Sequence, residues 1–197
     1  MLNRLLMAIL LIPSFNVWGE TPGNSEIMAA LQVKVAAIQK IAAKPIVIEA
    51  AKQQNAKNQP LDEIQKADQE WMSNKALSPL KVSMYESPVG AYLKNLVLAS
   101  QGQYNEAFMT DNKGANVAAY PVTSDYWQGD EDKFTQSYDS KQGKVYIGPV
   151  KYDESSQTNA AQISVPVLDE KNQNIGVLII GVSLAHAQSL VKFKQQK

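Results

Sequence analysis

The stretch from residue 160 to residue 184 decides the fold and reads AAQISVPVLDEKNQNIGVLIIGVSL. In its first part, Ile163 and Val165 belong to an alternating pattern with a period of two, which is typical of a strand with one buried face. The run 175–184 is apolar on both faces, which predicts a central strand covered on both sides. Between the two runs, residues 169–174 include Asp and Asn, which tolerate the backbone of a hairpin turn. We therefore expect an antiparallel hairpin in a sheet that the rest of the chain must cover.

The chain before the sheet, residues 25–100, is predicted to be helical. Apolar residues at helical spacing indicate a first amphipathic helix, and Pro45 must kink or split it because the proline ring collides with the preceding turn. A second helix is expected over residues 61–71 and a third over residues 91–99. The Ser-Pro pairs between residues 78 and 88 indicate irregular chain. The apolar residues of the first helix are Ile27, Leu31, Val35, Ile38 and Ala42.

The sheet is expected between residues 103 and 184, and a short helix within this region is expected to begin near Asp130. The order is helices first and then about five antiparallel strands, which defines an α+β fold with the long helices on one face of the sheet. Residues 121–140 must close the other face, so a ligand pocket is expected between the sheet and this insert. A short amphipathic helix is expected to end the chain from about Leu184. The strands predicted before the hairpin cover residues 104–110, 115–120 and 144–152.

Composition limits the class of protein. With 197 residues, of which 45% are hydrophobic, the chain is expected to form one domain over residues 25–197. Residues 1–19 combine Arg4, an apolar run and a small residue at Gly19, which is typical of a secretory signal peptide, and residues 20–24 are expected to be a linker. Cysteine is absent, which excludes disulfides, thiol nucleophiles and thiolate metal sites. We therefore expect an exported protein, located in a bacterial periplasm.

The charged and catalytic residue types argue against two further classes. Arg4 is the only arginine and the chain is near neutral, a composition unsuited to nucleic acid, whose recognition depends on clustered Arg and Lys. His186 is the only histidine, and neither a GxSxG nor an HExxH motif occurs. We therefore expect no nucleic-acid binding, no enzymatic activity, no metal site and no cofactor.

Four segments resemble a single Cache domain, the extracytoplasmic PAS-like sensor module of bacterial chemoreceptors and histidine kinases. The resemblance covers nearly all of residues 25–197, and its most specific parts are DYWQGD (125–130) and VPVLDEKNQNIGVL (165–178). It implies a five-stranded antiparallel sheet with a long N-terminal helix on one face and a small-ligand pocket on the other. The four segments are PLDEIQKADQEW (60–71), FMTDNKGANVAAYPVTSDYWQGDEDKF (108–134), GKVYIGPVKYD (143–153) and AQISVPVLDEKNQNIGVLIIGVSL (161–184).

The resemblance also bears on the partners of the protein. Cache modules usually lie between two membrane helices and lead into a cytoplasmic output domain, whereas this sequence ends at Lys197 with neither. The sequence thus resembles a free-standing periplasmic Cache protein, and we expect it to signal through a separate membrane receptor or kinase. The N-terminal helix is expected to lie across the sheet, and a coiled-coil seam that forms a homodimer is the alternative role for it.

Residues 117–134 hold the densest run of groups suited to contact a ligand, including Gln128 and Glu131. Aromatic rings attract cations, each contact contributing about 0.5–2 kcal/mol, and carboxylates pair with an ammonium group. In amino-acid-sensing relatives an arginine clamps the ligand carboxylate, but beyond Arg4 this chain offers only lysine or backbone N–H groups for that role. We therefore expect a small amine-containing or zwitterionic metabolite whose amine is the dominant group. The candidate ligand-binding residues are Tyr120, Asp125, Tyr126, Trp127, Asp130, Tyr146 and Asp153.

A structural interpretation of the same residues stays open. Tyr126 and Trp127 would then plug the insert onto the sheet, Asp130 would only cap a helix, and Asp153 would only serve a turn. The protein would be a non-enzymatic interaction module with a filled pocket and an exposed apolar patch along residues 27–48. A solute carrier for a transporter is disfavoured, because such carriers are usually larger and two-lobed. The space between Trp127 and the sheet separates the first two interpretations.

Overall fold

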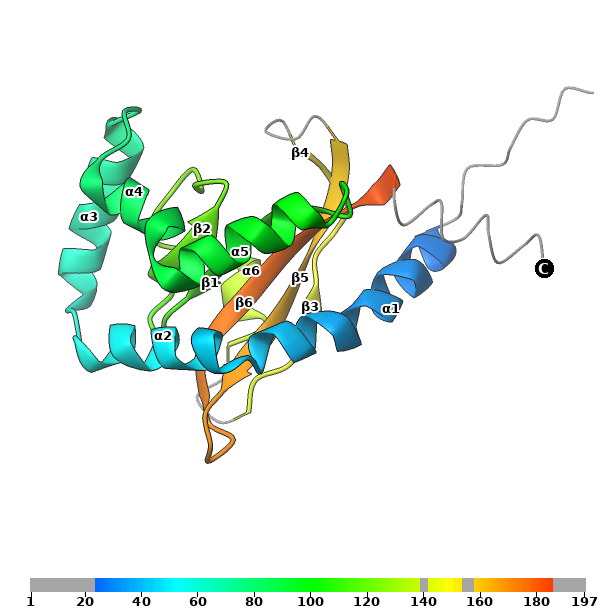
Figure 1. Cartoon of the computed structure of the whole chain (residues 1–197), viewed down its shortest axis with the longest axis horizontal. Helices are drawn as coiled ribbons and strands as arrows, with labels where there is room; N and C mark the ends of the chain where they lie inside the picture. The colour runs from blue at the N-terminus through cyan, green and yellow to red at the C-terminus, as the bar shows by residue number, and fades with distance from the viewer. Residues whose placement is uncertain (1–23, 139–141, 154–157, 186–197) are drawn as a thin grey trace, which may run out of the picture.

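Helices come first in the chain and strands afterwards, as the sequence predicts (Figure 1). The structure, a computed structural model, describes residues 24–138, 142–153 and 158–185. The helices are α1 (Asn24–Ala42), α2 (Pro45–Ala56), α3 (Leu61–Ser73), α4 (Pro79–Glu86), α5 (Pro88–Ala99) and α6 (Asp132–Thr135). The strands are β1 (Tyr104–Thr110), β2 (Asn116–Tyr120), β3 (Tyr146–Ile147), β4 (Lys151–Asp153), β5 (Thr158–Leu168) and β6 (Asn174–Ser183).

The strands form one antiparallel sheet in the order β2-β1-β6-β5-β3, with β4 also paired to β5. The single strand predicted over residues 144–152 is divided into β3 and β4 at Gly148 and Pro149. Proline has no N–H to donate to a neighbouring strand, so the ladder is interrupted there. The α+β class and the antiparallel sheet are confirmed, with two short strands sharing one edge of β5.

The central hairpin forms as predicted. β6 lies between β1 and β5, and almost all of its residues are buried. In the turn, Asn172 has a φ of 59°, the left-handed conformation that asparagine tolerates. The Asp169 carboxylate accepts hydrogen bonds from the backbone N–H groups of Lys171 and Gln173, both at 2.8 Å. This local bonding sets the register of the hairpin.

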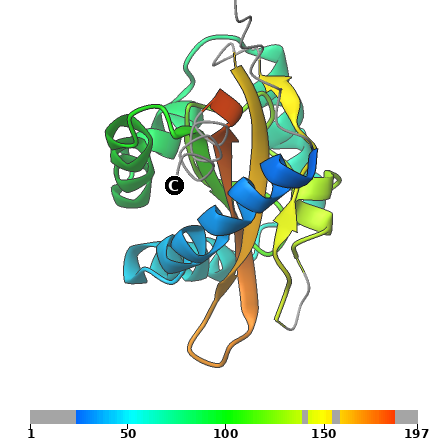
Figure 2. The same ribbon diagram turned by 90° about the vertical axis from the view of Figure 1, so that its right-hand side faces the viewer.

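The sheet is covered on both faces because successive residues of a buried strand point in opposite directions. On one face, α1, α2 and α5 pack against Leu178 and Ile180 of β6. On the other face, Val177 and Ile179 pack with Phe108 of β1, with α3 and α4, and with the segment around α6. Figure 2 shows the strands between α2 and α5 on one side and α6 on the other. Helices α1, α2 and α5 thus lie opposite the insert, as expected, whereas α3 and α4 lie on the same face as the insert.

Between α3 and α5, residues 79–86 are helical, and the prediction of irregular chain is wrong for this part, although residues 74–78 are not helical. Ser87 is the N-cap of α5, and its hydroxyl accepts a hydrogen bond from the N–H of Gly90 at 3.1 Å. Pro88 occupies the first turn, where the missing N–H removes no helical hydrogen bond. Ser78 and Pro79 begin α4 in the same way. The Ser-Pro pairs therefore start helices.

Pro45 splits the N-terminal helix, since α1 ends at Ala42 and Pro45 is the first residue of α2. The short helix of the insert begins at Asp132, and its N-cap residue is Glu131, whose side chain makes no capping hydrogen bond to the helix backbone, so the expected cap at Asp130 is not formed. The expected signal peptide and most of the expected terminal helix lie outside the described residues. Among the helices of the described residues, none has the length and apolar character needed to cross a membrane.

Candidate ligand-binding site

A cavity of about 400 Å³ lies on the sheet face opposite α1. Strands β1 and β5 form its floor, and residues 123–125 and 131–133 of the insert form one wall. The opposite wall comes from the chain of β3 and β4. The cavity therefore lies between the sheet and the insert, where the sequence predicts a pocket. Its aromatic lining residues are Phe108, Tyr146 and Tyr152.

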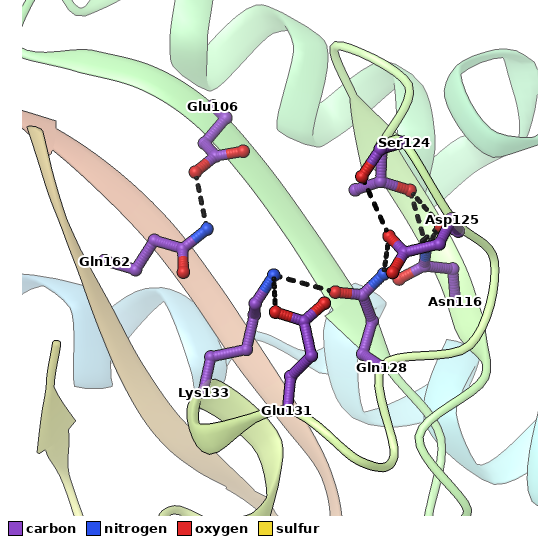
Figure 3. Close-up of polar contacts among 9 residues, drawn as sticks. Glu106, Asn116, Ser124, Asp125, Gln128, Glu131, Lys133 and Gln162 are labelled. Atoms are coloured by element: carbon purple, nitrogen blue, oxygen red, sulfur yellow. Dashed lines mark hydrogen bonds and ion pairs between the residues drawn. The ribbon is translucent and has the colours of Figure 1, made fainter. Parts of the chain in front are cut away.

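A polar network runs along the insert wall (Figure 3). Gln128 is fully buried, and its Nε2 donates to Asp125 Oδ1 at 2.7 Å and to the Asp125 carbonyl at 3.2 Å. Its Oε1 accepts a hydrogen bond from Lys133 Nζ at 3.0 Å. Lys133 Nζ also pairs with Glu131 Oε2 at 3.0 Å, and Ser124 donates to Asp125 Oδ1 at 3.1 Å. One buried amide thus joins an acid to a lysine and fixes both side chains.

The sheet floor carries a second polar contact. Gln162 Nε2 of β5 donates to Glu106 Oε1 of β1 at 2.9 Å, although β6 lies between these strands. Gly181 of β6 is paired with both residues. A Cβ at Gly181 would lie 2.6 Å from Glu106 Cγ, so only glycine leaves room for the two side chains to meet across the central strand.

The cavity has an excess of acidic groups. Its lining contains four carboxylates and two lysines. Lys133 is directed toward the inside, since its side chain is only 16% exposed and its Nζ lies 5.5 Å from the ring centroid of Phe108. The lysine is therefore held both by acids and by an aromatic face. The charged lining residues are Glu106, Asp125, Glu131, Asp132, Lys133 and Lys151.

The protonation of Glu131, an acid of the cavity lining, is affected by its surroundings. Burial raises the pKa of the Glu131 carboxyl above its usual value of 4.5, because the charged form loses hydration. The adjacent Lys133 lowers this pKa, while the negative charge of Asp125 raises it, and the net direction is upward. A positive charge entering the cavity would favour ionised Glu131.

The predicted site residues are only partly brought together. Asp125 and Tyr146 line the cavity. Asp130 is exposed to solvent, and Tyr120 packs on the helix-covered face, where Lys94 Nζ lies 5.7 Å from its ring. Asp153 ends β4, and its side chain lies outside the described residues. Asp125 and Tyr146 are therefore the two candidates that the structure places at the cavity.

The two remaining candidates pack into the core beside the cavity. Tyr126 is 3% exposed, and its ring centroid lies 5.6 Å from that of Trp71. Trp127 Nε1 donates to the Lys113 carbonyl at 2.8 Å. The backbone N–H groups of Tyr126 and Trp127 both donate to Asp68 Oδ1 of α3, at 2.7 and 3.0 Å. These aromatic residues anchor the insert, as the structural interpretation expects, but the cavity beside them stays open.

Several cavity residues were missed by the sequence analysis. Glu106 and Phe108 are two apart on β1, and Gln162 alternates with buried Ile163 on β5, so the period-two pattern already places them on the insert face. Lys133 directly follows an acidic run, a position that would have suggested an ion pair. In the described part of the chain, carboxylates do not gather in a group of three or more that could hold a metal ion.

No protein-family model and no curated protein matches the sequence. Similar solved structures include the sensor domain of the V. cholerae histidine kinase DctB, with 14% identity, a TM-score of 0.49 and coverage of 85% of this chain. The E. coli DcuS sensor domain has 14% identity, a TM-score of 0.48 and coverage of 86%. The ligand-binding domain of the Campylobacter jejuni chemoreceptor Tlp3, in complex with L-norvaline, has 15% identity, a TM-score of 0.41 and coverage of 85%.

These similarities concern the fold. The match spans 54% of the DctB chain, 99% of the DcuS chain and 64% of the Tlp3 chain. All three structures are sensor or ligand-binding domains by name, the class that the sequence resemblance to a Cache domain implies. At these identities no ligand and no residue role is carried over.

Proposed function

We propose that this protein is an exported sensory domain that binds a small amine-containing or zwitterionic metabolite in the cavity beneath the insert. The observation that carries the proposal is the cavity lining, in which Glu106, Asp125, Glu131 and Asp132 outnumber Lys133 and Lys151. An excess of carboxylates around a small cavity attracts a cation. Lys133 supplies a partner for a carboxylate group, the role for which the chain offers no arginine beyond Arg4.

The acids of the insert wall are held in place and keep capacity for a ligand. Asp125 accepts from Gln128 and Ser124, and Glu131 accepts from Lys133. An ionised carboxylate has about four lone-pair sites, so each can accept further N–H groups from an ammonium ligand. Tyr146 and Phe108 add aromatic surface for the apolar part of the ligand. The lining thus suits a molecule with a charged amine and a small apolar body.

Isothermal titration calorimetry with a matched set of ligands tests the proposal. Butylamine, norvaline and pentanoate share a short alkyl chain and differ in whether they carry an amine, both groups or a carboxylate. We expect butylamine and norvaline to bind. Pentanoate should bind more weakly than either by a factor of roughly 10 or more, because one charged hydrogen bond contributes about 1.5–3 kcal/mol. Tight binding of pentanoate or of succinate without any amine binding would overturn the proposal.

The affinity for butylamine is expected to rise with pH. Burial raises the pKa of Glu131 above its usual value of 4.5. A fraction of this carboxyl therefore stays protonated at a pH above 4.5. An ammonium ligand favours the ionised form, and binding must then release a proton, which is easier as the pH rises through the raised pKa. Glu131→Gln should lower the affinity and flatten the pH dependence above about pH 5, where ordinary carboxyls are ionised. Unchanged pH dependence in this variant would exclude Glu131 as the linked group.

Export and signalling form the second part of the proposal. The basic and apolar character of residues 1–19 supports a signal peptide and a periplasmic location. The resemblance to a Cache domain supports a separate membrane receptor or kinase as partner. A ligand changes the state of such a partner only if the ligand binds one of two conformations of this protein more tightly than the other. In this proposal the insert, which contacts the ligand, is the element that differs between the two conformations. A homodimer would use the exposed face of α1, which carries Met28 and Val33.

An interaction module with a filled pocket is the second candidate. The core packing of Tyr126 and the hydrogen-bonded indole of Trp127 favour it, since both residues fill space beneath the insert. Exposed Met28 and Val33 lie within the range 27–48 where an apolar patch is expected. The calorimetry decides between the two: an interaction module would bind none of the three ligands.

A further inference from the structure

Lys133 places a positive charge of the protein itself in the cavity beneath the insert, which we call the acidic cavity. Its side chain belongs to α6, lines the cavity and is only 16% exposed. The Nζ atom lies 3.0 Å from Gln128 Oε1, 3.0 Å from Glu131 Oε2 and 5.5 Å from the ring centroid of Phe108. Figure 3 shows this ammonium group joined to both polar partners. The cavity thus already contains an alkylammonium group.

The contacts around this ammonium group suit any primary amine. A primary ammonium has three N–H donors and no acceptor. At this position one donor meets an amide oxygen, another meets a carboxylate, and the charge faces an aromatic ring. Each of these contacts favours an alkylammonium cation. All of them are made to the terminal nitrogen of the lysine, so the amine of a free ligand can make the same set.

Gln128 keeps an acceptor directed at this position. The residue is fully buried, and its Nε2 donates to Asp125 Oδ1 at 2.7 Å and to the Asp125 carbonyl at 3.2 Å. A flipped amide would set Oε1 against the carbonyl, which only accepts, and Nε2 against the Lys133 ammonium, which only donates. Removing the ammonium without a replacement would leave the buried Oε1 without a donor, which is costly. The position therefore favours occupation by a cation.

The ammonium position can be reached from the cavity. Lys133, Glu131 and Phe108 all line the cavity, and the side chain of Glu131 is 39% exposed. Lysine carries its ammonium on a flexible four-carbon stem, so the head group can move into the open volume of about 400 Å³. When it moves aside, Gln128 Oε1 and the facing carboxylate oxygen of Glu131 are left as contacts for a ligand.

We propose that the position held by the Lys133 ammonium is the amine subsite of the acidic cavity, and that a ligand amine binds there by displacing Lys133. This inference rests on the proposed function and names the position that the amine takes. In an amino acid the carboxylate lies next to the amine, so the displaced Lys133 can pair with it. Displacement also releases α6 from its contact with Gln128, which changes the conformation of the insert upon binding.

NMR of the lysine side chains tests the displacement in the parent protein. With ¹³C-labelled lysine, each Cε methylene gives a signal, and Lys133→Arg identifies the Lys133 signal by its absence. In the free protein the ring current of Phe108 should shift this signal. Saturation with butylamine should move it to the position of the exposed Lys144 signal, which Lys144→Met identifies and which should itself stay unchanged.

A second lysine of the lining is the matched control for charge. Lys151 belongs to β4, lines the same cavity and is exposed. A competing side chain weakens ligand binding according to the fraction of time for which it leaves the subsite free, so Lys133→Met should tighten butylamine binding about 10-fold. Lys151→Met removes the same charge and should tighten it by no more than about 3-fold, as is typical of exposed charges. Isothermal titration calorimetry measures both changes.

Two outcomes would overturn the inference and leave amine binding intact. Butylamine binding without a change in the Lys133 signal would show that the amine takes another position. Equal gains for Lys133→Met and Lys151→Met would show that Lys133 acts only through its charge. If neither the parent protein nor Lys133→Met bound butylamine, the proposed function itself would fail. The two failures are therefore distinguishable.

Discussion

Replacing Gly90 by alanine is expected to lower the free energy of unfolding by about 2–3 kcal/mol. Helix propensity alone predicts the opposite, since alanine is favoured over glycine by about 1 kcal/mol inside a helix. Gly90 lies in the first turn of α5, however, where α4 and α5 meet. An added Cβ would lie 2.1 Å from the Met84 carbonyl oxygen and 2.7 Å from the Tyr85 Cα. These are backbone atoms that cannot rotate away, so the steric cost exceeds the gain in propensity.

Gly148→Ala is the matched control for this substitution. A Cβ at Gly148 would lie 3.5 Å from the Gln162 carbonyl oxygen, which is an ordinary contact. The unfolding free energy of the Gly148→Ala variant should stay within about 0.5 kcal/mol of that of the parent protein. Urea denaturation followed by circular dichroism measures both variants. Equal stabilities for Gly90→Ala and Gly148→Ala would contradict the close approach of α4 to α5.

Replacing Lys133 by methionine is expected to change the affinities of the acidic cavity for a simple amine and for a zwitterion in opposite directions. Lys133 pairs with Glu131 at 3.0 Å and donates to buried Gln128 at 3.0 Å. Removing this ammonium group leaves more negative charge for a simple amine such as butylamine, which should bind more tightly. A zwitterion such as norvaline loses the partner of its carboxylate and should bind more weakly. Each change is expected to be roughly 10-fold, the size of one charged hydrogen bond.

Two further variants separate this effect from loss of packing. Lys133→Arg retains the positive charge and should keep the parent affinities for norvaline and for butylamine. Lys144→Met removes an exposed lysine between α6 and β3, outside the cavity lining, and should leave both affinities unchanged. Calorimetry at about pH 8, above the usual titration range of carboxyls, measures the affinity of each variant for butylamine and for norvaline. A parallel loss of butylamine and norvaline binding in Lys133→Met would rule out the assigned role.

The main features of the fold could be predicted from local patterns. The period-two pattern around Ile163 and the doubly apolar run 175–184 identified the hairpin and the central strand, because side-chain direction in a strand follows residue number. Chain order also predicted the helices on one face, which holds for α1, α2 and α5, whereas α3 and α4 pack on the face of the insert. The Ser-Pro pairs were misinterpreted because the same residues favour both turns and helix N-termini, and only the following residues decide between them.

The candidate site was predicted at the level of the segment but not of the side chain. The insert has no regular period, so residue number does not tell which side chains face the sheet. Contacts distant in sequence decide this: Asp68 of α3 holds the backbone of Tyr126 and Trp127, which turns both rings into the core. Asp125, one residue earlier, faces the cavity instead.

By itself, the sequence determined the α+β class, the central hairpin and the segment that closes the second face of the sheet, because these depend on local periodicity and composition. The tertiary structure alone decided which charges meet. Glu106 and Gln162 touch only because Gly181 between them has no side chain, and Glu131, Lys133 and Asp125 form one network only through the buried amide of Gln128. Such contacts depend on the packing of strands and loops far apart in the chain, which no local pattern encodes.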